Sequence, residues 1–202
     1  MNVNTYFDRL LTKYSNSFDI YMPYKIAGKS YPAYGYFYSH NEKYVLVQEA
    51  NMWTADSFEH MLFLTAEDAD DEVLAEAMEL IEGEMEEKLV RKGEKVPEKN
   101  HMSSLLTVII ICQNAVSEDV AKLVKSYSFD KGYNFHFRGY SKGRIAVISM
   151  VDEKIYLSKA MKKEDKKIFK SVFEEVKAGK DGFLAICEKQ GVKPFSQETK
   201  DC

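Results

Sequence analysis

The sequence predicts an α+β protein in which a mixed or antiparallel sheet is covered by amphipathic helices. Three observations support this class. Aromatic and β-branched residues alternate with period two over about 33–49 and again over about 132–151, which is typical of half-buried hairpins. An apolar run at 104–113 has the length of a buried strand. Elsewhere, apolar residues recur at the three- and four-residue spacing of a helix face.

The first hairpin is predicted from Tyr34, Tyr36 and Tyr38, which share one face of an extended segment. We expect the chain to turn at 40–42 and to return as a strand at 44–47. The tyrosines are then expected to form a packing layer, because large rings contribute most to the burial of a core.

The second hairpin is predicted in the same way from Tyr133, Phe135 and Phe137. A turn is expected at 139–143, where two glycines frame the segment. The apolar residues at 145–148 are expected to form the returning strand. Together, the two hairpins are expected to build most of the sheet.

Five further segments have one apolar face at helical spacing, and two shorter runs have strand length. The expected helices are 6–14, 71–90, 117–127, 163–178 and 181–191, and the expected strands are 61–64 and 154–157. Ser117 and Asp181 are expected to cap their helices, because a side-chain oxygen accepts hydrogen bonds from the first free backbone N–H groups.

The segment 91–100, RKGEKVPEKN, is the clearest linker candidate, because glycine, proline and charged residues interrupt both helix and strand. At 202 residues, length alone allows one domain or two. We expect a single α+β domain over 1–202. The alternative is two lobes, 1–92 and 100–202.

The composition indicates a globular protein with a large core, since 45% of the residues are apolar and 13% are aromatic. A net charge of −4 argues against a nucleic-acid partner, because such binding depends on excess lysine and arginine. No segment reaches the roughly 20 apolar residues that span a bilayer, so no membrane partner is expected. Three cysteines without close spacing form no disulfide framework, which favours the cytoplasm.

Charge is distributed unevenly along the chain. Residues 67–95 hold twelve acids and four bases, whereas residues 159–180 hold eight bases and four acids. We favour the interpretation that each stripe is a solvated helix face, because exposed ion pairs contribute only about 0–1 kcal/mol each. The alternative is that the two helices lie side by side.

Two histidines next to predicted strands are the main catalytic candidates. His60 follows Glu59, and His101 precedes the strand at 104–113. Because strand ends often meet at one edge of a sheet, Glu59, His60 and His101 could form an acid–base site. The alternative is that both imidazoles cap strand ends through backbone hydrogen bonds. No metal-ligand spacing occurs, so no metal site is predicted.

Arg138 and Arg144 flank the second predicted turn and are candidate ligand-binding residues. Guanidinium groups hold phosphates or carboxylates through paired hydrogen bonds. The alternative is that these cations only keep a hairpin tip soluble. Trp53, expected in the connection before 61–64, is a third ligand-binding candidate. The sequence has neither a glycine-rich phosphate loop nor a G-x-S-x-G serine motif.

The chain contains YPAYGYFY at 31–38, NEKY at 41–44, Glu59–His60 and His101–Met102. Together these motifs resemble an uncharacterised bacterial family that is known only as a domain of unknown function. The resemblance covers about 5–160. It implies a small cytosolic bacterial protein without an assigned activity, and it identifies no catalytic residue.

These observations favour a non-catalytic cytosolic protein that binds a protein or small-molecule partner. No catalytic motif with recognised spacing is present, whereas aromatic residues and segregated charges suit a binding surface. The alternative is a small-molecule or metal-dependent enzyme with a site at Glu59, His60 and His101. Neither the ligand nor a cofactor follows from the sequence.

Overall fold

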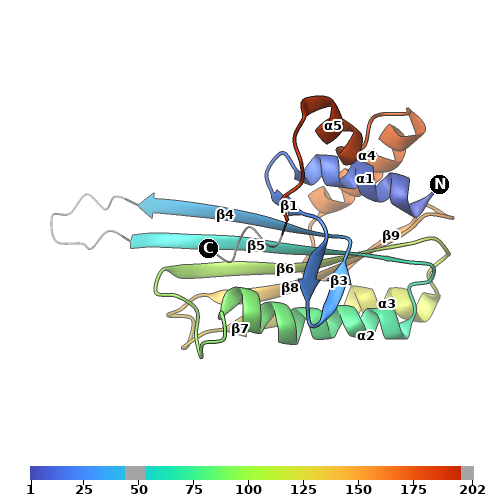
Figure 1. The fold of residues 1–202 in the computed structure, drawn as a ribbon. Helices are drawn as coiled ribbons and strands as arrows, with labels where there is room; N and C mark the ends of the chain where they lie inside the picture. The colour runs from blue at the N-terminus through green and yellow to red at the C-terminus, as the bar shows by residue number, and fades with distance from the viewer. Residues whose placement is uncertain (44–52, 197–202) are drawn as a thin grey trace.

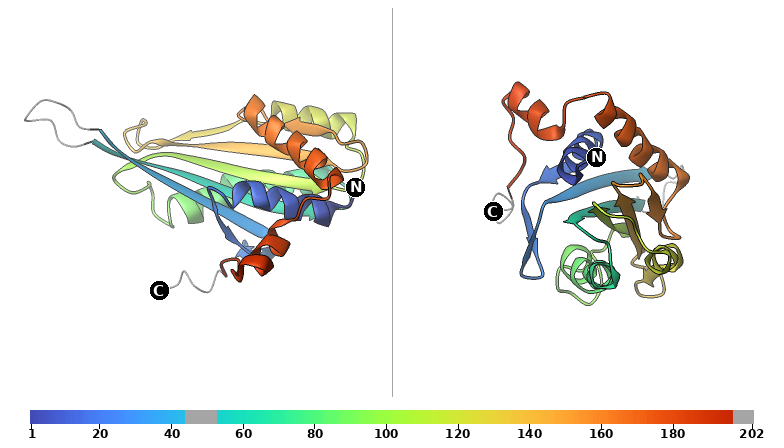
Figure 2. Two further views of the ribbon diagram at one scale, coloured as in Figure 1. Left: turned by 90° about the horizontal axis from the view of Figure 1, so that it is seen from above. Right: turned by 90° about the vertical axis from the view of Figure 1, so that its right-hand side faces the viewer.

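The computed structural model describes residues 1–43 and 53–196, with side chains except at 41–43 and 53–54. A seven-stranded sheet lies between two layers of helices (Figure 1, Figure 2). One layer contains α1 (Val3–Tyr14), α4 (Lys163–Lys177) and α5 (Phe183–Gln190). The other contains α2 (Asp71–Glu79), its continuation η1 (Leu80–Val90), and α3 (Glu118–Ser126). The predicted α+β class with a mixed sheet is therefore confirmed.

The sheet has the strand order β1, β4, β5, β6, β8, β7, and β9 also pairs with β8. β5, β6 and β8 are parallel, and the other neighbours are antiparallel. The bounds are β1 (Asp19–Tyr21), β4 (Ala33–Lys43), β5 (Trp53–Ala66), β6 (His101–Cys112), β7 (Phe129–Gly132), β8 (Tyr140–Ser149) and β9 (Ile155–Leu157). A separate hairpin joins β2 (Tyr24–Ile26) to β3 (Lys29–Tyr31). The predicted linker 91–100 leads from η1 into β6. β5 precedes this linker in the sequence and β6 follows it, and the two strands are neighbours in one sheet.

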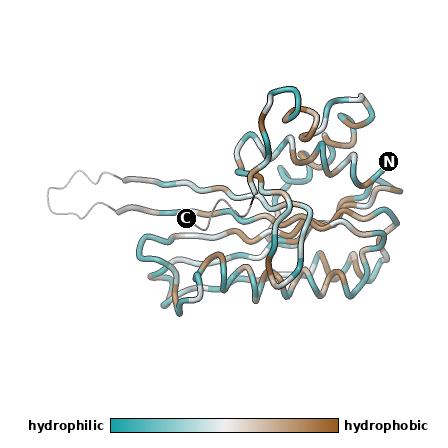
Figure 3. Tube along the Cα trace, in the orientation of Figure 1, coloured by the Kyte–Doolittle hydropathy of each residue, from teal (hydrophilic) through white to brown (hydrophobic). Residues whose placement is uncertain are grey.

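The core has two parts, one on each face of the sheet. Along β6, Leu106, Val108 and Ile110 pack against the layer of α2, η1 and α3. Ile109 and Ile111 pack against α1 and α4 on the opposite face. Because both faces of these parallel strands are covered, the strand sequence is a continuous apolar run. Figure 3 shows this apolar stretch where the sheet lies between the helices.

The predicted helices are found at or near their expected bounds. Ser117 caps α3 as expected, because its Oγ accepts from the N–H of Val120 at 3.2 Å. Leu123 of α3 is 45% exposed, whereas Val120 and Val124 on the same helix are buried. Within the described residues, no helix is both long enough and apolar enough to cross a bilayer.

The helix predicted over 71–90 is regular in its first half and π-helical in its second. In η1 the buried positions Leu80, Met85 and Val90 are five residues apart, and the N–H of Arg91 donates to the Glu86 carbonyl at 3.1 Å. Hydrogen bonds over five residues widen each turn. As a result, η1 buries Glu86, which a regular helical period places outside the apolar face.

The first predicted hairpin is correct in its first strand and wrong in its turn. The three tyrosines lie in β4, but β4 continues straight through the expected turn at 40–42. It pairs antiparallel with β5, a long strand that includes the predicted strand at 61–64. The expected return at 44–47 lies outside the described residues. Pairing with β5 keeps the polar residues of 40–42 extended, because strand propensity depends strongly on context.

The second predicted hairpin is wrong in its aromatic strand. The first strand of the observed hairpin is β7, and residues 133–139 form the turn into β8. Asn134, Phe135 and His136 have φ angles of 49°, 54° and 68°. Left-handed backbone costs roughly 1–2 kcal/mol per non-glycine residue. Tertiary contacts must hold this turn, so local sequence preferences do not reveal it.

The acidic and basic helices lie on opposite faces of the sheet, so the side-by-side arrangement is wrong. Figure 1 places α2 below the strands and α4 above them. The outer residues of α4, such as Lys166 and Lys170, are exposed, as are Glu72 and Glu82 on the acidic helix. Most of each stripe is a solvated helix face, as the favoured interpretation predicts. Glu86 and Glu175 are exceptions, because both are largely buried and form ion pairs.

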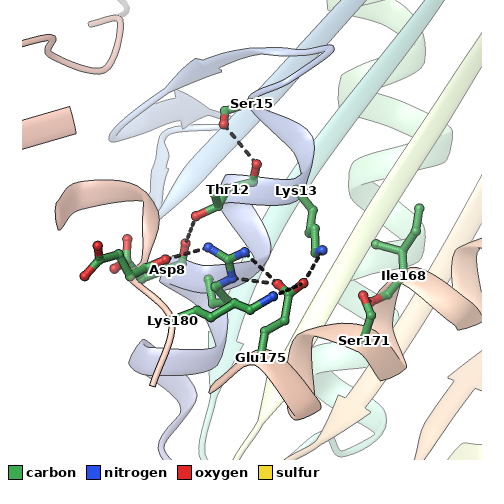
Figure 4. Close-up of polar contacts among 10 residues, drawn as sticks. Asp8, Thr12, Lys13, Ser15, Ile168, Ser171, Glu175 and Lys180 are labelled. Atoms are coloured by element: carbon green, nitrogen blue, oxygen red, sulfur yellow. Dashed lines mark hydrogen bonds and ion pairs between the residues drawn. The ribbon is translucent and has the colours of Figure 1, made fainter. Parts of the chain in front are cut away.

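The helix layer of α1, α4 and α5 is tied together by carboxylates that receive several donors. Glu175 on α4 accepts from Arg9 at 2.7 Å and from Lys13 at 2.6 Å, both on α1. Figure 4 shows Lys13 and Lys180 directed at the same carboxylate. Asp8 accepts from the N–H of Leu184 at 2.8 Å and so caps α5.

The cap of α5 by Asp8 takes the place of the predicted cap by Asp181. The residue at the N-cap of α5 is Gly182, not Asp181. A Cβ atom at Gly182 would lie 1.8 Å from the Asp8 carboxylate, so the close approach of the two helices requires glycine there. Asp181 instead pairs with Lys189.

We predict that Glu175→Gln lowers the free energy of unfolding by about 1–2 kcal/mol at neutral pH, because charged hydrogen bonds are lost from a partly solvated cluster. Burial alone would raise the pKa of Glu175, yet hydrogen bonds from Lys13 and Arg9 lower that pKa from 4.5 to about 2. This stability is therefore present above pH 4.5 and is lost as the pH falls towards 2. Urea unfolding of wild type and variant at several pH values measures the contribution of Glu175 to the free energy of unfolding. The exposed neighbour Glu174 supplies the control, since Glu174→Gln should change little.

Candidate functional site

A cavity of about 650 Å³ lies between the sheet and the end of η1. Rings supply most of its lining, which includes Tyr21, Tyr24, Tyr34, Tyr36, Phe58 and His60. His101 and Ser104 of β6 extend this wall, and Lys88, Leu89, Val90, Lys92 and Glu98 close the opposite side. The cavity thus joins residues that are far apart in the sequence.

Strand alternation explains why the rings gather on one face. In β4 and β5, even-numbered residues face the layer of α2 and η1. Tyr36 lies directly opposite His60, and Tyr34 is the next residue on the same face. Tyr24, from the small hairpin, stacks on Tyr34 with ring centroids 4.2 Å apart and planes inclined by 20°. Phe58 stacks on His101 at 5.9 Å with an angle of 9°.

His60 is held inside this aromatic wall. Its side chain is buried, and the Tyr34 hydroxyl lies 2.6 Å from its Nδ1 atom. Burial raises the pKa of Tyr34 well above its ordinary value, so the hydroxyl stays protonated at neutral pH. The Tyr34 hydroxyl is therefore a neutral hydrogen-bonding group in the cavity wall.

His101 reaches the same face because β6 is irregular at its start. The register with β5 shifts between the pairs Asp56–His101 and Ser57–Ser103, which leaves Met102 as an extra residue. In a regular strand, His101 would face the same side as Ser103, away from the cavity. The bulge re-aims its side chain.

Both nitrogens of His101 have partners within the protein. Nδ1 lies 2.9 Å from the carbonyl of Arg138, and Nε2 lies 2.8 Å from the hydroxyl of Ser104. Because a carbonyl only accepts, Nδ1 carries the proton and Nε2 accepts from Ser104. Burial lowers the pKa of His101 below its ordinary value of 6.5, so the imidazole is neutral at pH 7.

A buried carboxylate fixes the elements around the cavity. Glu86 is 1% exposed and receives hydrogen bonds from Arg91 at 2.8 Å and from the Tyr133 hydroxyl at 2.8 Å, together with an ion pair from Lys131 at 2.9 Å. Burial alone would raise the pKa of Glu86, but these three donors hold that pKa below its ordinary value. Tyr133 in turn contacts the His101 ring edge-on at 5.7 Å.

A second polar cluster lies on the opposite face of the sheet. Arg144 is buried, and it donates to Glu59 at 2.9 Å and to Thr107 at 2.8 Å. All three residues face the side of α1 and α4, since they alternate with cavity-side residues on their strands. The guanidinium of Arg144 is therefore engaged within the protein.

The structure thus brings together only some of the candidate residues. His60 and His101 line one cavity, whereas Glu59 and Arg144 form a pair across the sheet from it. Arg138 contributes its carbonyl to His101. Trp53 begins β5, but its side chain lies outside the described part of the structure. The sequence analysis did not identify Ser104 and Tyr24 as site residues. The alternation of Tyr34 and Tyr36 did predict that one face of their strand carries aromatic rings.

Comparison with known families gives one match. Residues 2–171 match the family described as Domain of unknown function (DUF8052). The chain belongs to this family. No curated protein and no solved structure matches this chain. The cavity and its lining lie within the segment that defines this DUF8052 member, whereas the last helix lies beyond it.

Among the residues described for this DUF8052 protein, no three histidine, cysteine, aspartate or glutamate side chains are placed to hold a metal ion. His60 lies beside the Tyr34 hydroxyl, and His101 lies beside the Ser104 hydroxyl. The described site therefore offers stacking surfaces and hydrogen-bonding groups, with Lys88, Lys92 and Glu98 as its charged residues.

We predict that His101 titrates below its ordinary pKa of 6.5 and carries its proton on Nδ1. Because the folded pKa is lower than the unfolded one, the contribution of His101 to stability falls as the pH decreases through 6.5. Nitrogen-15 NMR of labelled imidazole reports both the tautomer and the pKa, and His101→Gln assigns the signal. An Nε2-protonated ring, or a pKa above 6.5, would contradict the observed geometry.

Proposed function

We propose that this protein binds a small, flat organic molecule in the cavity between the sheet and η1. The observation that carries the proposal is the ring-lined volume of about 650 Å³, which lies within the usual range of ligand sites. A neighbouring hollow of about 330 Å³ shares Tyr24, Lys88 and Leu89 with it, so the accessible space continues past the mouth.

The lining supports a ligand with an aromatic ring and an acidic group. Parallel rings such as Tyr24 and Tyr34 favour stacking against a flat molecule. Lys92 at the mouth pairs with Glu98 at 2.6 Å, and both side chains are largely exposed. Because exposed ion pairs contribute little, a carboxylate or sulfonate on the ligand can replace Glu98.

Binding without chemistry is supported by the separation of the candidate acid–base residues. Glu59, the carboxylate proposed beside His60 and His101, lies across the sheet from both of them. We also propose the cytosol as the place of action, because the buried cysteines Cys112 and Cys187 are free thiols, as expected in a reducing compartment.

The dye anilinonaphthalene sulfonate, a flat aromatic anion, tests this proposal. We expect it to bind the folded protein in this cavity and to raise the melting temperature, because a ligand that binds the native state more tightly than the unfolded state stabilises it. Leu89→Trp fills the cavity mouth and should weaken binding at least about tenfold. Leu184→Ala, on the exposed surface of α5, is the control and should bind like wild type. Unchanged affinity in Leu89→Trp would reject this cavity as the site.

The hydrogen bond from Ser104 to His101 favours one second candidate, an enzyme that acts through a serine nucleophile. In that reaction, Ser104 Oγ attacks an acyl carbon while His101 Nε2 takes the hydroxyl proton and later returns it to the leaving group. A fluorophosphonate probe should then label Ser104 with loss of fluoride, and both Ser104→Ala and His101→Gln should prevent labelling. If mass spectrometry finds no label on the wild-type protein, the enzyme candidate is rejected and only the binding function remains.

A further inference from the structure

The turn at 133–139, here called the aromatic loop, places two phenylalanine rings in solvent. Phe135 is 92% exposed and Phe137 is 82% exposed, more than any other large apolar side chain in the described residues. Single exposed apolar residues are common, but two rings on one tight turn form a patch that usually marks an interaction site. The cavity proposed above does not include them.

This exposure belongs to an ordered loop. The N–H of Phe137 donates to the Asn134 carbonyl at 3.0 Å, and the N–H of Arg138 donates to the Tyr133 carbonyl at 3.1 Å. Tyr133 is anchored on the buried Glu86. The protein thus holds the two rings outward in advance, and such preorganisation lowers the entropic cost of binding.

Two close contacts hold the aromatic loop against the neighbouring strands. A Cβ atom at Gly132 would lie 2.6 Å from the ring of His136, so that ring lies against β7. A Cβ atom at Gly139 would lie 2.4 Å from the carbonyl of Met102, so the loop also packs on the bulge of β6. Asn134, Phe135 and His136 all have left-handed backbone. Such strained backbone is maintained only where the surrounding structure enforces it.

The aromatic loop lies at a cationic end of an acidic protein. β6 and β8 are parallel neighbours, and Ser103 pairs with Tyr140, so the segments that precede them meet at one end of the sheet. These segments, 91–100 and 131–142, hold seven lysines and arginines and two acids. Glu86 and Asp130 pair with three of these cations, and counting both acids still leaves an excess of three positive charges, although the whole chain carries −4. The Arg138 guanidinium, next to Phe137, forms no ion pair with a described residue.

We propose that the aromatic loop docks this protein on an anionic membrane surface, with Phe135 and Phe137 entering the interface and Arg138 contacting lipid headgroups. Apolar side chains gain from burial at the acyl boundary, and nearby cations are attracted to anionic lipid. A projecting tip suits a soft bilayer surface, whereas base stacking uses rings that lie flat on a sheet. The lack of a membrane-spanning segment in the sequence does not bear on docking of this kind. This inference is independent of the proposed ligand.

Flotation of the full chain with lipid vesicles tests the proposal. We expect binding to phosphatidylcholine vesicles that contain about 30% phosphatidylglycerol, and much weaker binding to phosphatidylcholine alone or at high salt. The double substitution Phe135→Ala and Phe137→Ala, and separately Arg138→Glu, should each weaken binding at least about tenfold. Val151→Ala removes an exposed apolar side chain beyond the far end of β8 and should leave binding unchanged.

Three results would overturn the proposal. Wild-type protein that does not float with anionic vesicles has no docking function of this type. Equal binding by wild type and the double phenylalanine variant would move the contact elsewhere. Binding of a single-stranded oligonucleotide that depends on the two rings, without vesicle binding, would assign the loop to nucleic acid instead.

Because both rings are exposed, the variants should keep the wild-type melting temperature, and a large decrease would contradict the exposure on which the proposal rests.

Discussion

The parallel pairing of β5 with β6 is the interaction on which the rest of the structure depends. It joins the segments before and after 91–100 into one sheet, and it brings Phe58 beside Ser104. Parallel neighbours need a long crossover, which α2 and η1 provide. The crossover covers one face of the sheet, and its final turns form a wall of the cavity. Without this pairing, neither the buried apolar ladder nor the ring-lined cavity could exist.

Two irregular features shape the cavity within this regular frame. The bulge at Met102 turns His101 onto the face that carries His60, and the π-helical turns of η1 bury Glu86. Each feature disturbs ideal hydrogen bonding and is stabilised by polar contacts, through the Arg138 carbonyl in one case and through Arg91 in the other. Removing a donor from a buried carboxylate is costly, because the buried charge is then less fully compensated. Irregular backbone at this end of the sheet therefore coincides with both proposed binding regions.

The two proposed contacts use different physical properties of aromatic residues. Tyr34 and Tyr24 pack ring against ring inside a cavity, where stacking geometry selects a flat ligand. Phe135 and Phe137 project into solvent, where only their apolar area matters. The cavity and the aromatic loop are nevertheless in contact, because Tyr133 meets the His101 ring edge-on and the Arg138 carbonyl lies 2.9 Å from His101 Nδ1.

The sequence by itself determined the α+β class, the helices and the tyrosine face of β4, because these depend on apolar periodicity within a segment. The serine cap of α3 is equally local. Only the tertiary structure decided that Tyr133 begins a turn and that Glu59 turns away from His60 towards Arg144. It also decided that His101 lines the same cavity as His60, since this placement needs strand pairing and a bulge between residues far apart in the chain. Local patterns record which side chains share a face, whereas register, bulges and buried ion pairs arise only when distant segments pack together.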